Sequence, residues 1–160
     1  MTKPRVILTL SDTDSAERFI PLIILLQSLS DINEYHLRRG LAAGRPYPRL
    51  YDSGVVYKEE KPGREDWPDI PKVLSQGWGD CEDLAAYRAA ELRVYDGIDA
   101  EPVIKWKWIP VEEMRAAGWA RHKLPRDGIW LVHCLVRHQD GTIEDPSLLL
   151  GMGGEYTNTI

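Results

Sequence analysis

Apolar and polar residues follow one another along this chain in patterns that predict helices first and strands later. Helical spacing of apolar residues predicts helices over 15–29, 31–43 and 81–95. Alternation of apolar and polar side chains predicts a strand over 100–109, and a largely apolar run predicts another over 129–138. Because the helices precede the strands, the pattern favours an α+β fold.

The remaining predicted elements are short, and loops rich in glycine and proline join them. They are strands at 6–10, 55–57 and 142–145, a helical turn at 70–74, a short helix at 110–117, and a loop from residue 146 onward. At 160 residues the chain is long enough for one domain with its own hydrophobic core. We expect the apolar run at 20–26 to belong to that core.

Charge and hydropathy limit which partners we expect and in which cellular compartment we expect the protein. The net charge is −5 and the basic residues are scattered, so neither nucleic acid nor an anionic membrane surface is an expected partner. The longest apolar run, 19–26, is too short to span a membrane. The apolar stretch at 6–10 is too short for a signal peptide. We therefore expect a location in the cytoplasm, or in a host cytoplasm or virion if the chain is phage-encoded.

A cysteine stands where the 81–95 helix should begin, within the run Gly-Trp-Gly-Asp-Cys-Glu-Asp-Leu-Ala at 77–85. Backbone N–H groups and the positive end of the helix dipole lower the pKa of a cysteine in that place and favour the thiolate. Cys81 is therefore a candidate nucleophile. Pairing it with Cys134 would block that role, so a reducing compartment is expected. Cys134 itself is expected to be a small buried apolar residue.

A cysteine nucleophile needs a base, which is usually histidine. His133 lies in the middle of the apolar strand at 129–138, where a polar ring must find a partner or line a site. The alternative is a core histidine whose hydrogen bonds are satisfied. The other histidines lie on a predicted helix (His36), in a charged loop (His122) and at a strand end (His138).

The turn that follows this strand selects an acid to orient the histidine. Gln139-Asp140-Gly141 suits a three-residue hairpin loop with glycine at the left-handed position. That loop pairs residue 135 with Asp145 and places Asp145 on the same face as His133, one diagonal step away. A two-residue loop would turn Asp145 to the opposite face, so the turn favours Asp145 over Glu144. The alternative is that Asp145 is an ordinary turn residue before proline.

These residues together resemble a known family. The run Gly-Asp-Cys-Glu-Asp-Leu-Ala at 79–85, His133 on a strand, and Asp145-Pro-Ser after a hairpin are similar to the transglutaminase-like branch of the papain-like superfamily, especially its small bacterial and phage-type cysteine proteinases. The similarity covers about residues 55–150 and is absent from 1–45. It implies a cysteine helix packed on an antiparallel sheet that carries the histidine and the aspartate. A single domain over 1–160 would then have a catalytic core at 55–150 and an N-terminal helical extension at 1–45.

The resemblance also implies a reaction, acyl transfer from the amide of a protein or peptide. His133 would accept the proton of Cys81, Asp145 would hold the ring, and the thiolate would attack the amide carbonyl to give a thioester. Water would resolve the thioester in a thiol protease or amidase, and a second amine would do so in a crosslinking transglutaminase. Beside the Cys81 backbone N–H, Gln76 and Trp78 are candidate oxyanion donors. Trp78 is equally suited to be a hydrophobic lid.

A different class of function is a non-catalytic module with the same fold, which serves binding or the structure and assembly of a phage particle. The N-terminal helices would then dock an assembly partner. A complete set of cysteine, histidine and aspartate argues for the enzyme, since a purely structural protein does not need all three.

Asp80 and Glu82 flank the candidate nucleophile and have two interpretations. One is helix capping and favourable interaction with the helix dipole. The other, which the resemblance implies for some relatives, is calcium binding through hard oxygen ligands. A cation would offset the rise that neighbouring carboxylates cause in the pKa of a thiol. The expected chemistry itself requires no cofactor, and the cysteines lack the spacing of a zinc site.

Overall fold

The computed structural model describes residues 19–60, 66–116, 118 and 126–153. Within these ranges helices pack on an antiparallel sheet, so the α+β class is confirmed. The predicted strand at 6–10, the start of the predicted helix at 15–29, and His122 lie outside the described residues.

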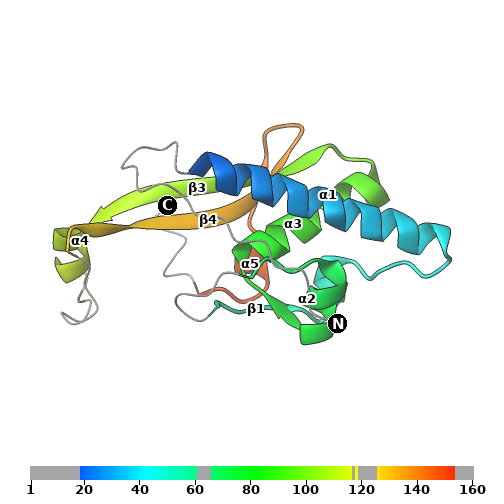
Figure 1. The fold of residues 1–160 in the computed structure, drawn as a ribbon, viewed down its shortest axis with the longest axis horizontal. Helices are drawn as coiled ribbons and strands as arrows, with labels where there is room; N and C mark the ends of the chain where they lie inside the picture. The colour runs from blue at the N-terminus through cyan, green and yellow to red at the C-terminus, as the bar shows by residue number, and fades with distance from the viewer. Residues whose placement is uncertain (1–18, 61–65, 117, 119–125, 154–160) are drawn as a thin grey trace.

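The sheet has three strands in the order β3-β4-β5: β3 (Ala100–Pro110), β4 (Gly128–His138) and β5 (Ile143–Glu144). The first two form a long ribbon whose outer end extends beyond α1 and α3 (Figure 1). Val136 pairs with Glu144, and the His138 backbone N–H donates to the Thr142 carbonyl at 2.9 Å. These pairs have the register predicted from a three-residue hairpin loop, and Gly141 has the predicted left-handed conformation with a φ of 84°.

The central helix α3 (Cys81–Glu91) lies against β3 and β4 and continues through a π-helical turn at Leu92–Asp96. Gly97 then ends it with a φ of 66°, which confirms the helix predicted at 81–95. Small side chains let the helix approach the sheet closely. Ala85, Ala86 and Ala89 are fully buried in one cluster with Cys134 and Val136 of β4.

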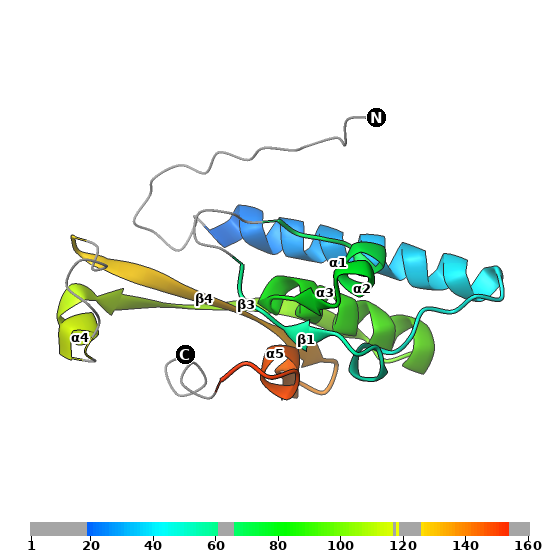
Figure 2. The same ribbon diagram turned by 90° about the horizontal axis from the view of Figure 1, so that it is seen from below.

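A single helix, α1 (Ile20–Ala42), replaces the two helices predicted over 15–29 and 31–43. It lies along α3 (Figure 2). The predicted break at residue 30 is wrong because Ser30 is used in packing. Its hydroxyl donates to the Ala86 carbonyl of α3 at 3.2 Å and accepts a bond from Arg93 at 3.0 Å.

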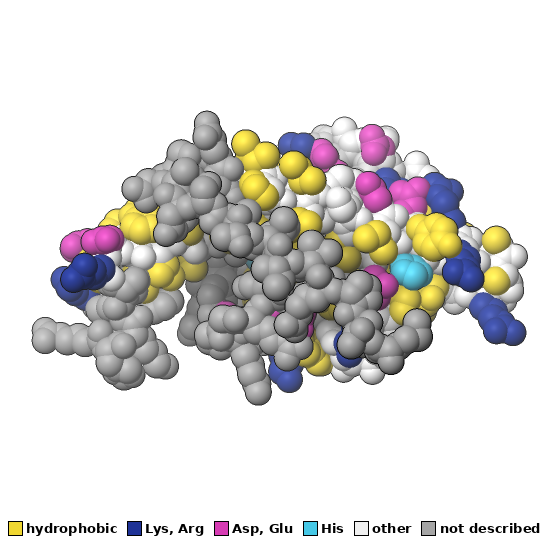
Figure 3. Space-filling view, viewed as in Figure 1, with side chains coloured by type: hydrophobic (Ala, Val, Ile, Leu, Met, Phe, Trp, Pro, Cys, Tyr) yellow, Lys and Arg dark blue, Asp and Glu magenta, His cyan; other side chains and the backbone are white. Residues whose placement is uncertain are grey.

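The apolar run at the start of α1 is only partly core, contrary to the prediction. Leu26 is buried, whereas the side chains of Ile20, Ile23 and Ile24 are exposed. Apolar side chains accordingly form patches over α1 and the outer part of the ribbon on the face shown in Figure 3. Among the described residues, no helix combines the length and apolar character that crossing a membrane requires.

Three short elements lie near the start of α3. Two-residue strands β1 (Val56–Tyr57) and β2 (Trp78–Gly79) pair in parallel, and α2 (Ile70–Gln76) lies between them in the chain. A 3₁₀ turn at Leu50–Asp52 also contacts α3. The helix α4 (Val111–Ala116) instead lies at the outer end of the ribbon, where it joins β3 to β4 (Figure 1). The strand predicted at 55–57 and the helices at 70–74 and 110–117 are thus confirmed.

The loop predicted from residue 146 is wrong, because the chain forms the short helix α5 (Pro146–Leu149). Asp145 caps it by accepting a hydrogen bond from the Leu148 N–H at 3.1 Å. Aspartate followed by proline is a typical helix start, since proline has no N–H and its φ suits the first helical position. The local sequence therefore contained the signal for this helix.

Candidate functional site

Cys81 is the first residue of α3, and the chain before it is shaped to begin a helix there. Asp80 and Asp83 form a reciprocal capping box, in which the Asp80 N–H donates to Asp83 Oδ2 at 3.3 Å. A side chain at residue 79 would conflict with this arrangement, because a Cβ on Gly79 would lie 3.0 Å from the Asp83 Cβ. The glycine therefore allows the cap and fixes where Cys81 emerges.

His133 and Asp145 lie together at the other side of the site. His133 Nε2 is 2.9 Å from Asp145 Oδ2, and their side chains are 10% and 19% exposed. The hairpin register predicted this diagonal pair, and the structure brings the two residues into hydrogen-bond contact. Because Asp145 occupies Nε2, the ring nitrogen left for a second partner is Nδ1.

Cys81 and His133 also interact, which is visible in the pKa of each group. Burial would lower the pKa of His133, but its interactions with Cys81 and with Asp145 outweigh burial and raise the pKa above its ordinary value. Conversely, His133 acts to lower the pKa of the Cys81 thiol. The structure thus brings the three predicted residues into one connected set, in the order Cys81, His133, Asp145.

The thiol itself is not in the activated form that the helix start predicts. Interaction with Cys134, followed by burial, raises the pKa of Cys81 well above its ordinary value. The Cys81 Sγ donates a hydrogen bond to Glu82 Oε2 at 3.3 Å. The expected fall in pKa is therefore wrong for this arrangement, because contacts from the sheet and burial outweigh the helix start.

Cys134 is buried in the core, as predicted, but it also reaches the site. The Sγ atoms of Cys81 and Cys134 and a carboxylate oxygen of Glu82 all lie within 4.8 Å of one another. Alternation along β4 assigns Cys134 to the face opposite His133, so the strand pattern does not predict that both side chains lie near Cys81. The contact depends on where α3 crosses the strand, which no local pattern encodes.

Three acidic residues at the start of α3 are buried: Asp80, Glu82 and Asp83. Burial is the main cause that raises the pKa of Glu82 to about 11 and that of Asp83 to about 11, with repulsion from neighbouring acids adding to it. Both groups are therefore neutral at pH 7. Asp83 Oδ1 has no hydrogen-bond partner among the described residues.

Calcium binding by Asp80 and Glu82 stays a prediction. In the structure Asp80 belongs to the capping box and Glu82 accepts the bond of the thiol. The ligand atoms that do converge, two sulfurs and one carboxylate oxygen, are not the oxygen-rich set that calcium prefers.

The two oxyanion candidates precede the nucleophile but are engaged with each other. Gln76 Nε2 donates to the Trp78 carbonyl at 2.8 Å, which holds the turn between α2 and β2. The Trp78 ring is partly buried, and the Lys58 ammonium lies over it in a cation–π contact, 5.1 Å from the ring centroid. A role for either residue at an oxyanion stays a prediction, and the Cys81 backbone N–H at the helix start remains the best-placed donor.

An ion-pair network next to Asp145 was missed by sequence reasoning. Glu144 accepts from Arg88 Nε at 2.7 Å, lies 2.8 Å from His138 Nε2, and accepts from the Tyr51 hydroxyl. Arg88 also binds the fully buried Glu91 at 2.5 Å. Burial alone would raise the pKa of Glu144, but the bonds from Tyr51 and Arg88 lower it. The network fastens β5, and with it Asp145, to α3.

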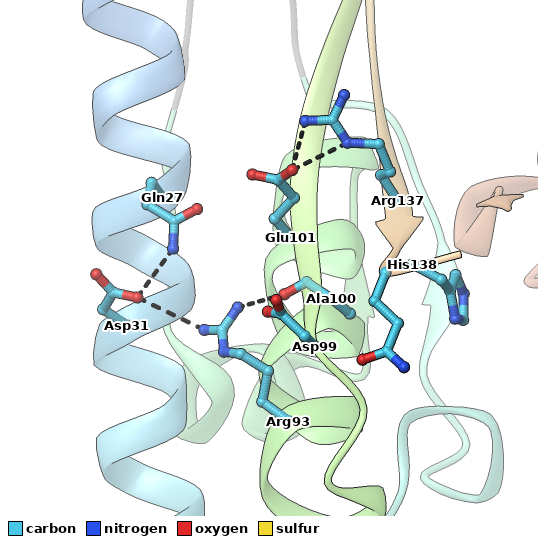
Figure 4. Close-up of a pocket in the computed structure, with 9 residues that line it drawn as sticks. Gln27, Asp31, Arg93, Asp99, Ala100, Glu101, Arg137 and His138 are labelled. Carbon is cyan, nitrogen blue, oxygen red and sulfur yellow. Dashed lines mark hydrogen bonds and ion pairs between the residues drawn. The ribbon is translucent and has the colours of Figure 1, made fainter. Parts of the chain in front are cut away.

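A polar hollow of about 430 Å³ lies elsewhere, between α1 and the inner end of the β3–β4 ribbon. In Figure 4 its arginines are paired, Arg137 with Glu101 and Arg93 with Asp31 and the Ala100 carbonyl. None of the predicted site residues lines it.

Comparison with known proteins yields no match: no family model, no curated protein and no solved structure is similar to the chain. The functional assignment therefore depends on the residues and their geometry.

Proposed function

We propose that this protein is a cysteine-dependent enzyme of the transglutaminase-like, papain-like kind that transfers or hydrolyses amide-bonded acyl groups of a protein or peptide. The observation that supports it most is the hydrogen bond between His133 and Asp145, made by the predicted register, on a ring that also interacts with Cys81. His133 and Asp145, which come from one hairpin, thereby support a nucleophile that lies 52 positions before His133 in the sequence.

Each step of the reaction uses a group with a defined partner. The proton of Cys81 Sγ moves to His133 Nδ1, and Asp145 stabilises the charged ring. The sulfur then attacks the amide carbonyl, and the Cys81 backbone N–H at the start of α3 stabilises the oxyanion. The C–N bond breaks, and the amine leaves with the proton from His133. A water or a second amine, deprotonated by His133, attacks the thioester and releases Cys81.

In the structure the Cys81 thiol donates its hydrogen bond to Glu82, so we interpret this arrangement as the resting state of the enzyme. The thiol must exchange Glu82 for His133 before it can react, because a proton held toward a carboxyl group is not in line with the ring. A neutral Glu82, as its pKa of about 11 gives at pH 7, makes this exchange easier than a charged one would.

A second candidate function is a binding or assembly module with the same fold. The observation that favours it is the raised pKa of Cys81, whose causes are the contact with Cys134 and burial. A thiol kept neutral in this way is typical of a structural cysteine.

Alkylation with iodoacetamide at neutral pH separates the two candidates. If the proposal is correct, Cys81 is alkylated fast in the wild type and much more slowly in His133→Ala, a comparison that does not depend on the different burial of Cys81 and Cys134. Incubation with a peptide library, followed by mass spectrometry, should then give cleaved or transamidated products that Cys81→Ala does not make. Equal, slow alkylation of both cysteines without products would favour the binding module.

A further inference from the structure

The two cysteines of this chain, its only ones, meet although 52 residues separate them in the sequence. Both are free thiols, and their sulfurs lie within 4.8 Å. Cys81 is at the partly buried start of α3, whereas Cys134 is 3% exposed in the middle of β4. Cys81 packs directly against the core cluster that contains Cys134.

The side chains around this pair include small ones. Ala85 and Ala86 of α3 belong to the same core cluster as Cys134, and Cys81 packs against that cluster. A disulfide needs a sulfur–sulfur distance of about 2.05 Å. Since each cysteine has a single side-chain torsion before its sulfur, a change of rotamer at Cys81 is the motion that shortens the distance. That rotation releases the hydrogen bond to Glu82.

We propose that Cys81 and Cys134 form an oxidative modification site, in which a peroxide oxidises Cys81 and Cys134 closes a reversible disulfide. In the first step a sulfur–oxygen bond forms at Cys81, the peroxide O–O bond breaks and one molecule of water leaves when the oxidant is hydrogen peroxide. In the second step Cys134 attacks the Cys81 sulfur, the disulfide forms, and the oxygen leaves as a second water. The thiols lose two electrons and two protons in total, which the peroxide accepts.

The position of Cys134 gives this site its particular chemistry. Cys81 is the more accessible thiol and meets the oxidant first, whereas Cys134 is buried and acts only as the resolving partner. The thiolate is the form that peroxide oxidises, and His133 is the neighbour that favours the Cys81 thiolate against Cys134 and burial. A sulfenic acid with a thiol next to it condenses to a disulfide before it can be oxidised irreversibly. The disulfide would therefore protect Cys81 and also switch off the acyl transfer proposed above. Only this effect on activity depends on the proposed function, whereas the disulfide itself does not.

The test is oxidation of the full chain with a small excess of hydrogen peroxide, followed by alkylation, intact mass and peptide mapping. We expect a mass loss of two hydrogens, a linked peptide that contains residues 81 and 134, and a fall of about tenfold or more in alkylation of Cys81. Dithiothreitol should restore both thiols. Because the chain has only two cysteines, the mass change has one intramolecular assignment.

Two variants make the result specific. Cys134→Ala, a small replacement suited to a cluster rich in alanine, should give a Cys81 sulfenic acid that dimedone traps and that proceeds to the sulfinic acid. Cys81→Ser should leave Cys134 unmodified by the same dose. If the wild-type chain over-oxidises Cys81 as fast as Cys134→Ala does, or gives only intermolecular dimers, the proposal is wrong. Alkylation of the untreated chain reports separately on the proposed function, so the two can fail independently.

Discussion

The molecule contains two histidine–aspartate pairs that are built alike. His36 Nε2 lies 3.1 Å from Asp69 Oδ2, and His133 Nε2 lies 2.9 Å from Asp145 Oδ2. In both pairs the aspartate is also a helix N-cap, since Asp69 Oδ1 accepts from the Lys72 N–H at the start of α2 and Asp145 Oδ1 accepts from the Leu148 N–H at the start of α5.

The two pairs differ in how exposed their side chains are and in which residues neighbour the imidazole ring. The His36 and Asp69 side chains are 24% and 36% exposed, and the neighbours of the ring are Tyr35 and Tyr47 in edge contact. His133 and Asp145 are more buried, and the ring interacts with a thiol. A histidine–aspartate hydrogen bond alone is thus a structural device that fastens one element to another. The chemistry requires the neighbouring Cys81.

Replacing each histidine with alanine should give the largest difference between the two pairs, measured as the rate of Cys81 alkylation. His133→Ala deletes the base, so we expect the rate of Cys81 alkylation at neutral pH to fall by about 10²-fold or more. His36→Ala is the matched control and should leave that rate unchanged. Alkylation kinetics followed by mass spectrometry measure both, with circular dichroism to verify folding. A similar rate for the two variants would remove the base role of His133.

Exchange of each aspartate for asparagine should have the next largest effect. Asp145→Asn removes a charge-assisted hydrogen bond worth about 1.5–3 kcal/mol, so the rate of Cys81 alkylation should fall roughly tenfold to a hundredfold. Asparagine preserves the N-cap of α5, which limits the cost to folding. Asp69→Asn should leave the rate as it is. A rate for Asp145→Asn within a factor of about two of the wild type would mean that the carboxylate does not support the ring.

A substitution in the β4–β5 hairpin should weaken the hydrogen bond between His133 and Asp145 and leave that between His36 and Asp69 unchanged. Gly141 adopts a φ of 84°, so Gly141→Ala should cost about 1 kcal/mol of unfolding free energy and loosen the register that aligns Asp145 with His133. Gly153→Ala is the control, because a Cβ there meets nothing within 4 Å and its φ is not left-handed. Urea denaturation gives the free energies, and the prediction is wrong if the two alanines cost the same.

The smallest expected effect is the titration of His133. Its pKa is above the ordinary 6.5, because interactions with Cys81 and Asp145 outweigh burial. Protonation of this ring therefore stabilises the folded state. The contribution is complete below about pH 6.5 and is lost as the pH rises through the higher pKa of the folded state. The NMR titration of the His133 ring proton should have its midpoint above 6.5, and a midpoint at or below that value would contradict the assigned contacts.

Local patterns predicted the elements that bring the site together, and one turn predicted its geometry. The loop Gln139-Asp140-Gly141 determines which residues pair, and strand alternation then places Asp145 beside His133. Both signals act over a few residues, so they could be obtained from the sequence. The same is true of α5, whose Asp-Pro start is a local helix signal, although the glycines that follow favour a loop.

The features that the sequence could not provide depend on how separate elements pack. Ser30 does not end α1 because a carbonyl of α3 receives its hydroxyl. The pKa of Cys81 is raised because Cys134 lies at the point where α3 crosses β4. Glu82 and Asp83 are neutral at pH 7 because the fold buries them, although both look like exposed acids of a first helical turn.

The two oxygens of Asp145 connect a backbone amide to a side-chain ring. Oδ1 accepts the Leu148 N–H and Oδ2 binds His133, so the amide proton of Leu148 is protected from exchange with solvent only while the carboxylate holds its position. The deuterium uptake of that single amide is therefore a measure of how long the imidazole stays aligned. It can be followed in the resting protein, without a substrate and without any change to the residues of the site.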